Sequence, residues 1–256
     1  MNSAFKEFSG EAAGTFILVF LGCGAVAVSI LFNWLPNIIA IAAVWGCGVV
    51  IAIYAVRSVC SAHFNPAVSL AMSITGNFQK NKLAMYFGAQ LAGSVMAGIV
   101  LHMVLGNAIQ KYEAMRHITR GTYESVVTAR MFGEFYAPHP VLSAMAAEAA
   151  GTFLLTAIIL TVSRKQSDKD GGSKLAALYI GAGLAVLICL FASVTQAGFN
   201  PARDFGPRLV SFFTGWGKAA FPDNAGGFFW VYIFAPFCGS ALAALLYNFL
   251  LKYSSK

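Results

Sequence analysis

The tripeptide Asn-Pro-Ala occurs twice in the sequence of 256 residues. Asn is a favoured helix N-cap because its side-chain oxygen accepts a hydrogen bond from the first turn, and Pro is favoured at the first helical position. Each triplet therefore predicts a helix start. At such an end the free N–H groups can donate hydrogen bonds to oxygen atoms, and the helix dipole gives a partial positive charge. The six residues are Asn65, Pro66, Ala67, Asn200, Pro201 and Ala202.

Two acidic residues, Glu11 and Glu148, each begin a second repeated string, EAAGTF. Both carboxylates fall in long apolar segments, where a charge is costly unless it has partners. Two roles are open: the carboxylates carry protons in a coupled transporter, or they accept hydrogen bonds from backbone beside the Asn-Pro-Ala triplets. His63, just before the first triplet, is either a donor facing a polar path or a brace for its loop.

The segments that carry these residues are strongly apolar. Hydrophobic residues make up 58% of the chain and charged residues 11%, against about 25% charged residues in soluble domains. Six segments reach the length of about 20 residues that a spanning helix needs. They run over 9–32, 38–56, 83–106, 141–163, 174–194 and 227–251. Two shorter stretches, 64–76 and 199–213, hold the triplets, so we expect an all-α membrane protein with six spans and two half-membrane, re-entrant helices.

The repeated strings indicate a duplicated half. EAAGTF begins at residues 11 and 148, and FNPA begins at 64 and 199, so both repeats are displaced by about 135 residues. Each half holds two spans, a re-entrant helix and a third span. Because three is an odd number, the second half enters the membrane from the opposite side, which gives an inverted repeat. We expect a single domain over 1–256, with repeat 1 at about 5–106 and repeat 2 at about 141–251.

In this arrangement the two re-entrant helices meet near the middle of the bilayer, N-terminus to N-terminus. The non-helical backbone before each triplet is tolerated at that depth only beside water or inside protein. Its carbonyls are expected to line a polar path along which water or a hydroxyl-bearing solute exchanges hydrogen bonds. A cation would meet positive helix ends without a compensating carboxylate. The residues expected to line this path are Ser61, Ala62, His63, Gln196, Gly198 and Phe199.

Lys and Arg are more frequent in the connections on the side of the two chain ends, which include Lys6, Lys80, Lys165 and Lys169. Basic connections stay in the cytoplasm. We therefore expect cytoplasmic termini and a place in the plasma (inner) membrane. This topology accounts for the formal net charge of +7, and no basic stripe with interleaved aromatic residues points to nucleic acid.

Together the duplicated Asn-Pro-Ala boxes, the inverted halves and Arg203 directly after the second box resemble the aquaporin family, also called major intrinsic proteins. The segment FNPARDFGPRLVSFFTGWG at 199–217, with Asp204, is similar to the glycerol-facilitator (aquaglyceroporin) branch. The resemblance covers essentially the whole chain. It implies a homotetramer with one pore in each subunit, and it supports the bracing role for Glu11 and Glu148.

The resemblance also places a narrow selectivity filter. Its four positions fall on Trp45, Ile188, Ala197 and Arg203. Trp45 would be an apolar wall for a carbon backbone, while Arg203 donates to hydroxyl groups, which favours small polyols. Glycerol facilitators usually have Phe where this chain has Ala197. The set is instead similar to that of plant members that pass urea and undissociated metalloid acids, so a wider aperture is implied.

The sequence therefore predicts a passive channel for glycerol, water and other small uncharged solutes that excludes ions and protons. The alternative is a proton-coupled secondary transporter that uses Glu11 or Glu148 as the carrier. An enzyme is not expected, because no nucleophile has a convincing His and acid partner. No cofactor and no metal site is expected, since His63, His102, His117 and His139 share no helical spacing.

Overall fold

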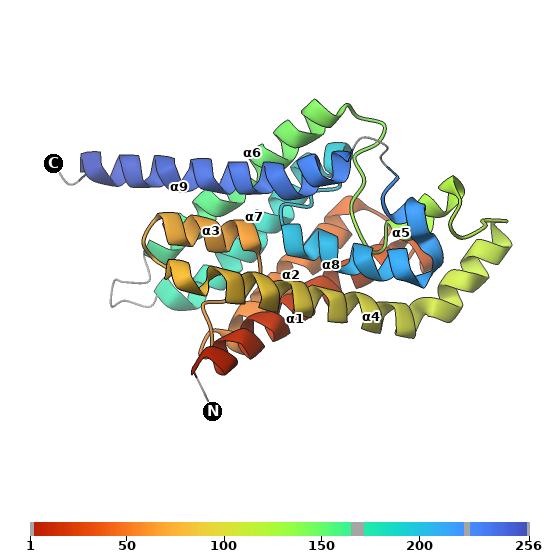
Figure 1. Ribbon diagram of the computed structural model, residues 1–256, viewed down its shortest axis with the longest axis horizontal. Coiled ribbons are helices and arrows are strands. Elements are labelled where there is room, and N and C mark those ends of the chain that lie inside the picture. The colour runs from red at the N-terminus through yellow and green to blue at the C-terminus, as the bar shows by residue number, and fades with distance from the viewer. Residues whose placement is uncertain (1–2, 165–171, 223–225, 255–256) are drawn as a thin grey trace.

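The computed structural model describes residues 3–164, 172–222 and 226–254, and these residues form helices and connections without any strand. Six helical segments are long and apolar enough to cross a bilayer. They are α1 (Ser3–Phe32), α2 (Ile38–Val56), α4 (Leu83–Met115), α6 (Val141–Arg164), α7 (Gly172–Thr195) and η6 (Phe229–Phe234) continued by α9 (Ala235–Ser254). The predicted all-α class with six spans is confirmed (Figure 1).

Two shorter helices begin at the Asn-Pro-Ala triplets: α3 (Pro66–Ile74) and α8 (Pro201–Ser211). Helix α3 runs toward the side where α1 begins and α9 ends, which we call the terminal face. Helix α8 runs toward the connection between α4 and α6, which we call the loop face (Figure 1). The remaining elements are η1 (Lys80–Lys82), η2 (Tyr123–Ser125), α5 (Val126–Ala129), η4 (Phe212–Trp216) and η5 (Gly217–Ala220).

The helix contacts follow the duplication. Helix α1 packs against α2 and α4, and in the same way α6 packs against α7 and α9. Each short helix crosses to the other half, since α3 packs mainly on α9 and α8 mainly on α4. The two halves therefore complete each other around a common centre.

Helices α2 and α7 join the two halves through a close contact between their backbones. A Cβ atom on Gly46 would lie 2.6 Å from the carbonyl oxygen of Gly181, and one on Gly181 would lie 2.5 Å from that of Gly46. Small residues permit such contact between membrane helices. The outer faces of the bundle expose large apolar side chains, such as Met103, Leu190 and Leu245, as lipid-facing surfaces do.

The third span extends farther than the predicted segment 83–106, because α4 continues to Met115. The apolar run ends near Asn107, but the polar residues that follow still form helix. Glu113 at the end of α4 pairs with Arg120 in the next connection, with Nη2 of Arg120 2.7 Å from Oε2. The helix thus anchors the connection 116–140 on the loop face. Lys165 and Lys169, used above for orientation, lie outside the described residues.

Candidate functional site

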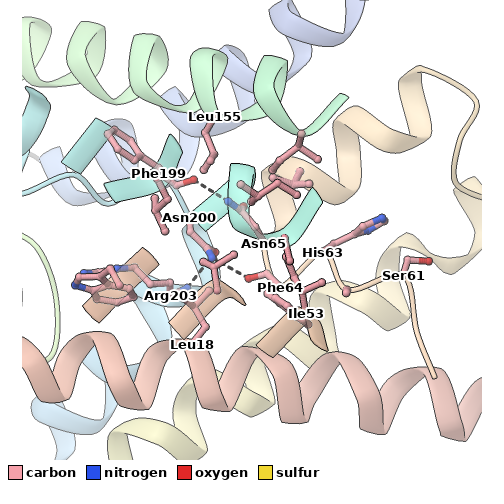
Figure 2. Close-up of a pocket in the computed structure, with 18 of the residues that line it drawn as sticks. Leu18, Ile53, Ser61, His63, Phe64, Asn65, Leu155, Phe199, Asn200 and Arg203 are labelled. Carbon is pink, nitrogen blue, oxygen red and sulfur yellow. Dashed lines mark hydrogen bonds between the residues drawn. The ribbon is translucent and has the colours of Figure 1, made fainter. Parts of the chain in front are cut away.

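A cavity of about 320 Å³ lies at the centre of the bundle, between the two halves. Toward the terminal face it reaches Arg57, Ser163 and Ala176, and toward the loop face it ends at Trp45 and Arg203. Most of its wall is apolar, and its lining contains two arginines and no carboxylate. Polar groups of the two Asn-Pro-Ala loops interrupt this wall on one side (Figure 2).

Asn65 and Asn200 cap α3 and α8 and also connect the two loops. The side-chain oxygen of Asn65 accepts from the N–H of Ala67 at 2.9 Å, and that of Asn200 accepts from the N–H of Ala202 at 3.1 Å. Asn65 Nδ2 donates to the carbonyl of Phe199, and Asn200 Nδ2 donates to the carbonyl of Phe64, both at 2.8 Å (Figure 2). Both side chains line the cavity, while Pro66, Ala67, Pro201 and Ala202 form the buried first turns.

Glu11 and Glu148 are fully buried and each holds one of these loops. Glu11 accepts from the N–H groups of His63 at 2.7 Å and Phe64 at 2.9 Å. Glu148 accepts from the N–H groups of Gly198 at 2.8 Å and Phe199 at 2.6 Å. Neither carboxylate is among the cavity-lining residues. The two carboxylates are thus placed to hold the loops in position, and neither is in contact with the cavity, as a proton carrier would have to be.

The backbone ahead of each triplet is held in an unusual conformation. Ala62 and Phe64 in one loop, and Gln196, Ala197 and Phe199 in the other, have φ between 53° and 64°, the left-handed region that costs a non-glycine residue about 1 kcal/mol or more. Only surrounding contacts such as the two braces can maintain it. The expected carbonyl-ladder residues that line the cavity are Ser61, Ala62, His63, Gly198 and Phe199.

The side chain of Gln196 contacts the connection 116–140. It is not among the residues that line the cavity, and its side-chain oxygen accepts from the N–H of Phe135 at 2.8 Å. His63 lines the cavity, and its Nδ1 lies 3.1 Å from the Ser69 hydroxyl. Its ring also packs against Phe78 and Tyr86.

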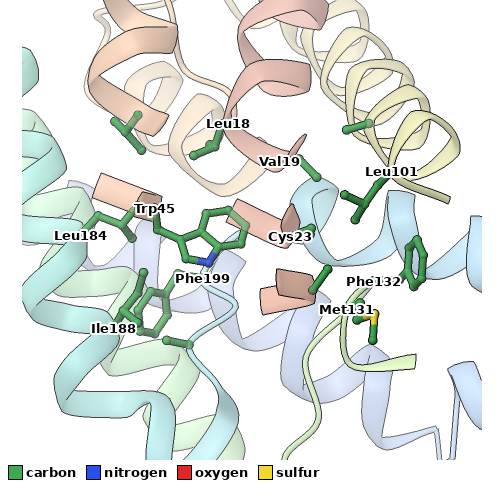
Figure 3. Packing of buried hydrophobic residues seen from close by; sticks show 14 of the residues in the cluster. Leu18, Val19, Cys23, Trp45, Leu101, Met131, Phe132, Leu184, Ile188 and Phe199 are labelled. Atoms are coloured by element: carbon green, nitrogen blue, oxygen red, sulfur yellow. The ribbon is translucent and has the colours of Figure 1, made fainter. Parts of the chain in front are cut away.

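All four residues assigned to the filter line the end of the cavity nearest the loop face. The ring of Trp45 covers the guanidinium of Arg203, with Cζ 4.2 Å from the ring centroid. A Cβ on Gly22 would lie 2.2 Å from this ring, so α1 leaves space for Trp45. Ile188, which belongs to α7, lies beside Trp45 of α2 (Figure 3). Arg203 Nη1 makes no hydrogen bond to the described residues.

Sequence reasoning missed a buried ionic cluster that adjoins the filter. Nη2 of Arg203 donates to Oε1 of Glu134, which lies in the connection 116–140. Asp204 accepts from the N–H of Glu134 at 2.6 Å, and Arg208 donates to Asp204 through Nε at 3.0 Å. The i,i+4 spacing of Asp204 and Arg208 on a helix could have indicated their pairing. No sequence signal distinguishes Glu134 from other acids of its connection.

Glu134 has an altered acidity in this cluster. Burial raises the pKa of its carboxyl to about 7, although the positive charge of Arg203 acts in the opposite direction. The side chain is almost completely shielded from solvent. Among the described residues, no group of three His, Cys, Asp or Glu side chains could hold a metal ion.

Comparisons with known proteins agree on one family. The model of the family described as major intrinsic protein matches residues 1–247. The chain is 36% identical over 256 aligned residues to the glycerol uptake facilitator protein of Pseudomonas aeruginosa, covering 97% of this chain and 90% of the relative. It is 30% identical over 256 aligned residues to a propanediol uptake facilitator of Citrobacter freundii, covering 98% and 94%.

A solved structure gives the same result for the fold. The X-ray structure of the aquaglyceroporin from Plasmodium falciparum matches with a TM-score of 0.83 and 27% sequence identity. The match covers 96% of both chains. It therefore includes both halves, the two short helices and the connections between them.

Proposed function

The chain belongs to the major intrinsic protein family, and from this premise we propose that its central cavity is the conducting path for glycerol and other small uncharged solutes. The protein is a multi-pass membrane protein and a passive channel, not an enzyme. The observation that carries the assignment is the pair Asn65 and Asn200. Two helix N-termini from opposite halves meet beside one cavity, and each amide is held by the loop of the other half.

We assign the recognition of solute to the polar groups on one side of the path and the apolar side chains on the other. A hydroxyl oxygen entering from the loop face meets the guanidinium of Arg203, which lines this end of the cavity and donates to it. The carbon backbone of the solute then contacts Trp45 and Ile188. Farther along, the amides of Asn65 and Asn200 and the loop carbonyls replace hydrogen bonds to water. Ala197 leaves space where a larger side chain would narrow the path, which extends the solute range to urea and undissociated metalloid acids as well as water.

Ions are excluded by several charges acting together. Each short helix directs the equivalent of about half a positive charge at the midpoint of the path. The cavity lining has no carboxylate to compensate a cation. Because Glu134 already pairs with Arg203, the filter is less positive than a lone arginine would make it. The helix N-termini therefore carry much of the barrier to cations and protons.

The proton-coupled alternative is not favoured. Both carboxylates that it requires, Glu11 and Glu148, are buried behind the loops and already accept backbone hydrogen bonds. The relatives named above are facilitators of uptake.

The protein's surroundings in the cell are also part of the proposal. The exposed apolar helix faces fit a lipid bilayer and the contacts of a homotetramer. The basic residues of the terminal face, including Lys80 and Lys82, support a cytoplasmic position for both chain ends in the plasma membrane. Cross-linking in native membranes tests the tetramer, and labelling of single cysteines placed at the two chain ends in intact cells tests the orientation.

The function is tested by stopped-flow light scattering on proteoliposomes. Purified protein is expected to speed equilibration of glycerol, urea and water over protein-free vesicles, with no accumulation against a gradient and no effect of an imposed pH gradient. Accumulation driven by protons would support the transporter instead. Vesicles with folded protein that pass none of these solutes would refute the channel.

A further inference from the structure

We propose that Arg208 is a positioning residue for the selectivity filter, acting through Asp204 and Glu134 to fix the guanidinium of Arg203. This inference rests on the proposed channel function and concerns residues that do not line the cavity. Arg208 is 1% exposed and lies one and a half turns beyond Arg203 on α8.

Arg208 uses its whole guanidinium to join three segments. Nε and Nη2 donate to the two carboxylate oxygens of Asp204, at 3.0 and 3.1 Å. Nη1 donates to the carbonyl of Ala220 at 2.6 Å, and Nη2 also donates to the carbonyl of Glu134. The flat faces of the group are covered by aromatic rings, whose centroids lie 4.6 to 5.5 Å from Cζ. These rings belong to Phe135, Phe221, Phe228 and Tyr232.

Glu134 is consequently held at both of its backbone polar atoms. Its N–H donates to Asp204 at 2.6 Å and its carbonyl accepts from Arg208. With its backbone fixed in this way, the side chain reaches Nη2 of Arg203. That bond occupies Nη2, while Nη1 is buried 3.9 Å from Oδ1 of Asp204. The bidentate contact of Arg208 with Asp204 thereby fixes the orientation in which the Arg203 guanidinium lines the cavity.

The connection also packs closely against the Arg208 guanidinium. A Cβ atom on Gly133 would lie 2.9 Å from Cζ of Arg208, so a larger residue there would push the connection away. The charges of the cluster are also balanced, because Arg203 and Arg208 face the two buried carboxylates of Glu134 and Asp204. Removing one charge would leave an unpaired buried partner, which is strongly destabilising.

The test uses two substitutions that keep every charge. Arg208→Lys retains the positive charge but loses the fork, since an ammonium cannot replace planar bidentate bonding. Gly133→Ala keeps all four charged side chains and forces the connection and the Arg208 guanidinium apart. Arg120→Lys is the matched control, because Arg120 also pairs with a carboxylate and covers an aromatic ring, that of Trp216, without contacting the filter.

Glycerol, urea and water permeabilities are measured in proteoliposomes, per folded protein as judged by size-exclusion chromatography. We expect both test variants to change the glycerol-to-urea ratio by about threefold or more, within the range that one ordinary hydrogen bond covers. Arg120→Lys should leave that ratio unchanged. A merely structural role would lower all permeabilities in parallel, so an unaltered ratio in Arg208→Lys and Gly133→Ala overturns the proposal. Failure of the wild-type protein to conduct would instead refute the channel function.

Discussion

The two short helices begin in the same way and continue differently. In both halves an Asn caps the helix, a buried Glu binds two backbone N–H groups of the loop, and the Asn amide donates to the opposite loop. After Ala67 and Ala202 the match ends. Val68 of α3 occupies the place of Arg203 in α8, and both line the cavity.

The difference extends along one face of each helix. The positions that correspond to Asp204 and Arg208 in α8 are Ser69 and Ser73 in α3, and Ser73 Oγ has no hydrogen-bond partner within the described residues. What the halves share builds the hydrogen-bonding midpoint of the path. What only the second half has is a charged cluster beside the end of the cavity nearest the loop face, where we propose the filter. On the proposed function, the shared parts form the passage and the divergence of the second copy gives its selectivity.

Removing either brace should have the largest effect and tests the shared part of the comparison. Glu148→Ala leaves the N–H groups of Gly198 and Phe199 without a partner, at a cost of about 1–3 kcal/mol each. Glu11→Ala should have a similar cost, because Glu11 makes equivalent bonds to the first loop. Both variants should therefore lower the thermal midpoint in detergent to a similar extent. Glu7→Ala, which removes a more exposed carboxylate of α1, is the control. A loss confined to one brace would show that the halves are not equivalent.

Replacing Arg203 by Val makes the second half resemble the first. The change leaves the buried carboxylate of Glu134 unpaired, which should lower stability by about 3 kcal/mol. It should also weaken the exclusion of cations, measured as conductance in planar bilayers. The double substitution Arg203→Val with Glu134→Gln restores the charge balance and should recover most of the stability. Unchanged ion exclusion in Arg203→Val would remove Arg203 from the filter.

Narrowing the filter is expected to have an intermediate effect. Ala197→Phe adds a ring beside Trp45 and should reduce urea permeability relative to glycerol by about tenfold, as modest steric changes in apolar sites do. Ala62→Phe is the matched control, because Ala62 holds the corresponding place in the first loop with a similar φ of 53°, against 64° at Ala197. If both variants shift the ratio equally, the narrow point does not lie at Ala197.

The smallest effect concerns pH. With its pKa raised to about 7, Glu134 is mostly ionised at pH 8 and becomes protonated as the pH falls toward about 6. Protonation removes the negative charge that faces Arg203, Asp204 and Arg208, so Arg203 becomes a stronger donor to solute. We expect the glycerol-to-urea ratio to change by about twofold over this interval. Glu134→Gln should abolish the change, and a pH dependence that persists in this variant would assign it to another group.

The sequence predicts the parts of the molecule that depend on local rules. Apolar length gives the six spans, and the cap chemistry of Asn65 and Asn200 gives the start of each short helix. The exact end of α4 escapes prediction because helix continues after the apolar run stops. The partner of Arg203 also escapes it, because Glu134 lies 69 residues away in a connection without periodicity. Contacts between distant irregular segments are set by tertiary packing alone.

The crossed amides of Asn65 and Asn200 have a consequence for how the nascent chain matures. Until the second half has been synthesised, the first loop lacks both the acceptor for its amide and the donor for the carbonyl of Phe64. Its re-entrant segment cannot settle in the hydrocarbon with those groups unsatisfied. Assembly must therefore be completed after translation has passed Asn200, and a half-length ancestor would have needed an upside-down copy of itself to close the same bonds.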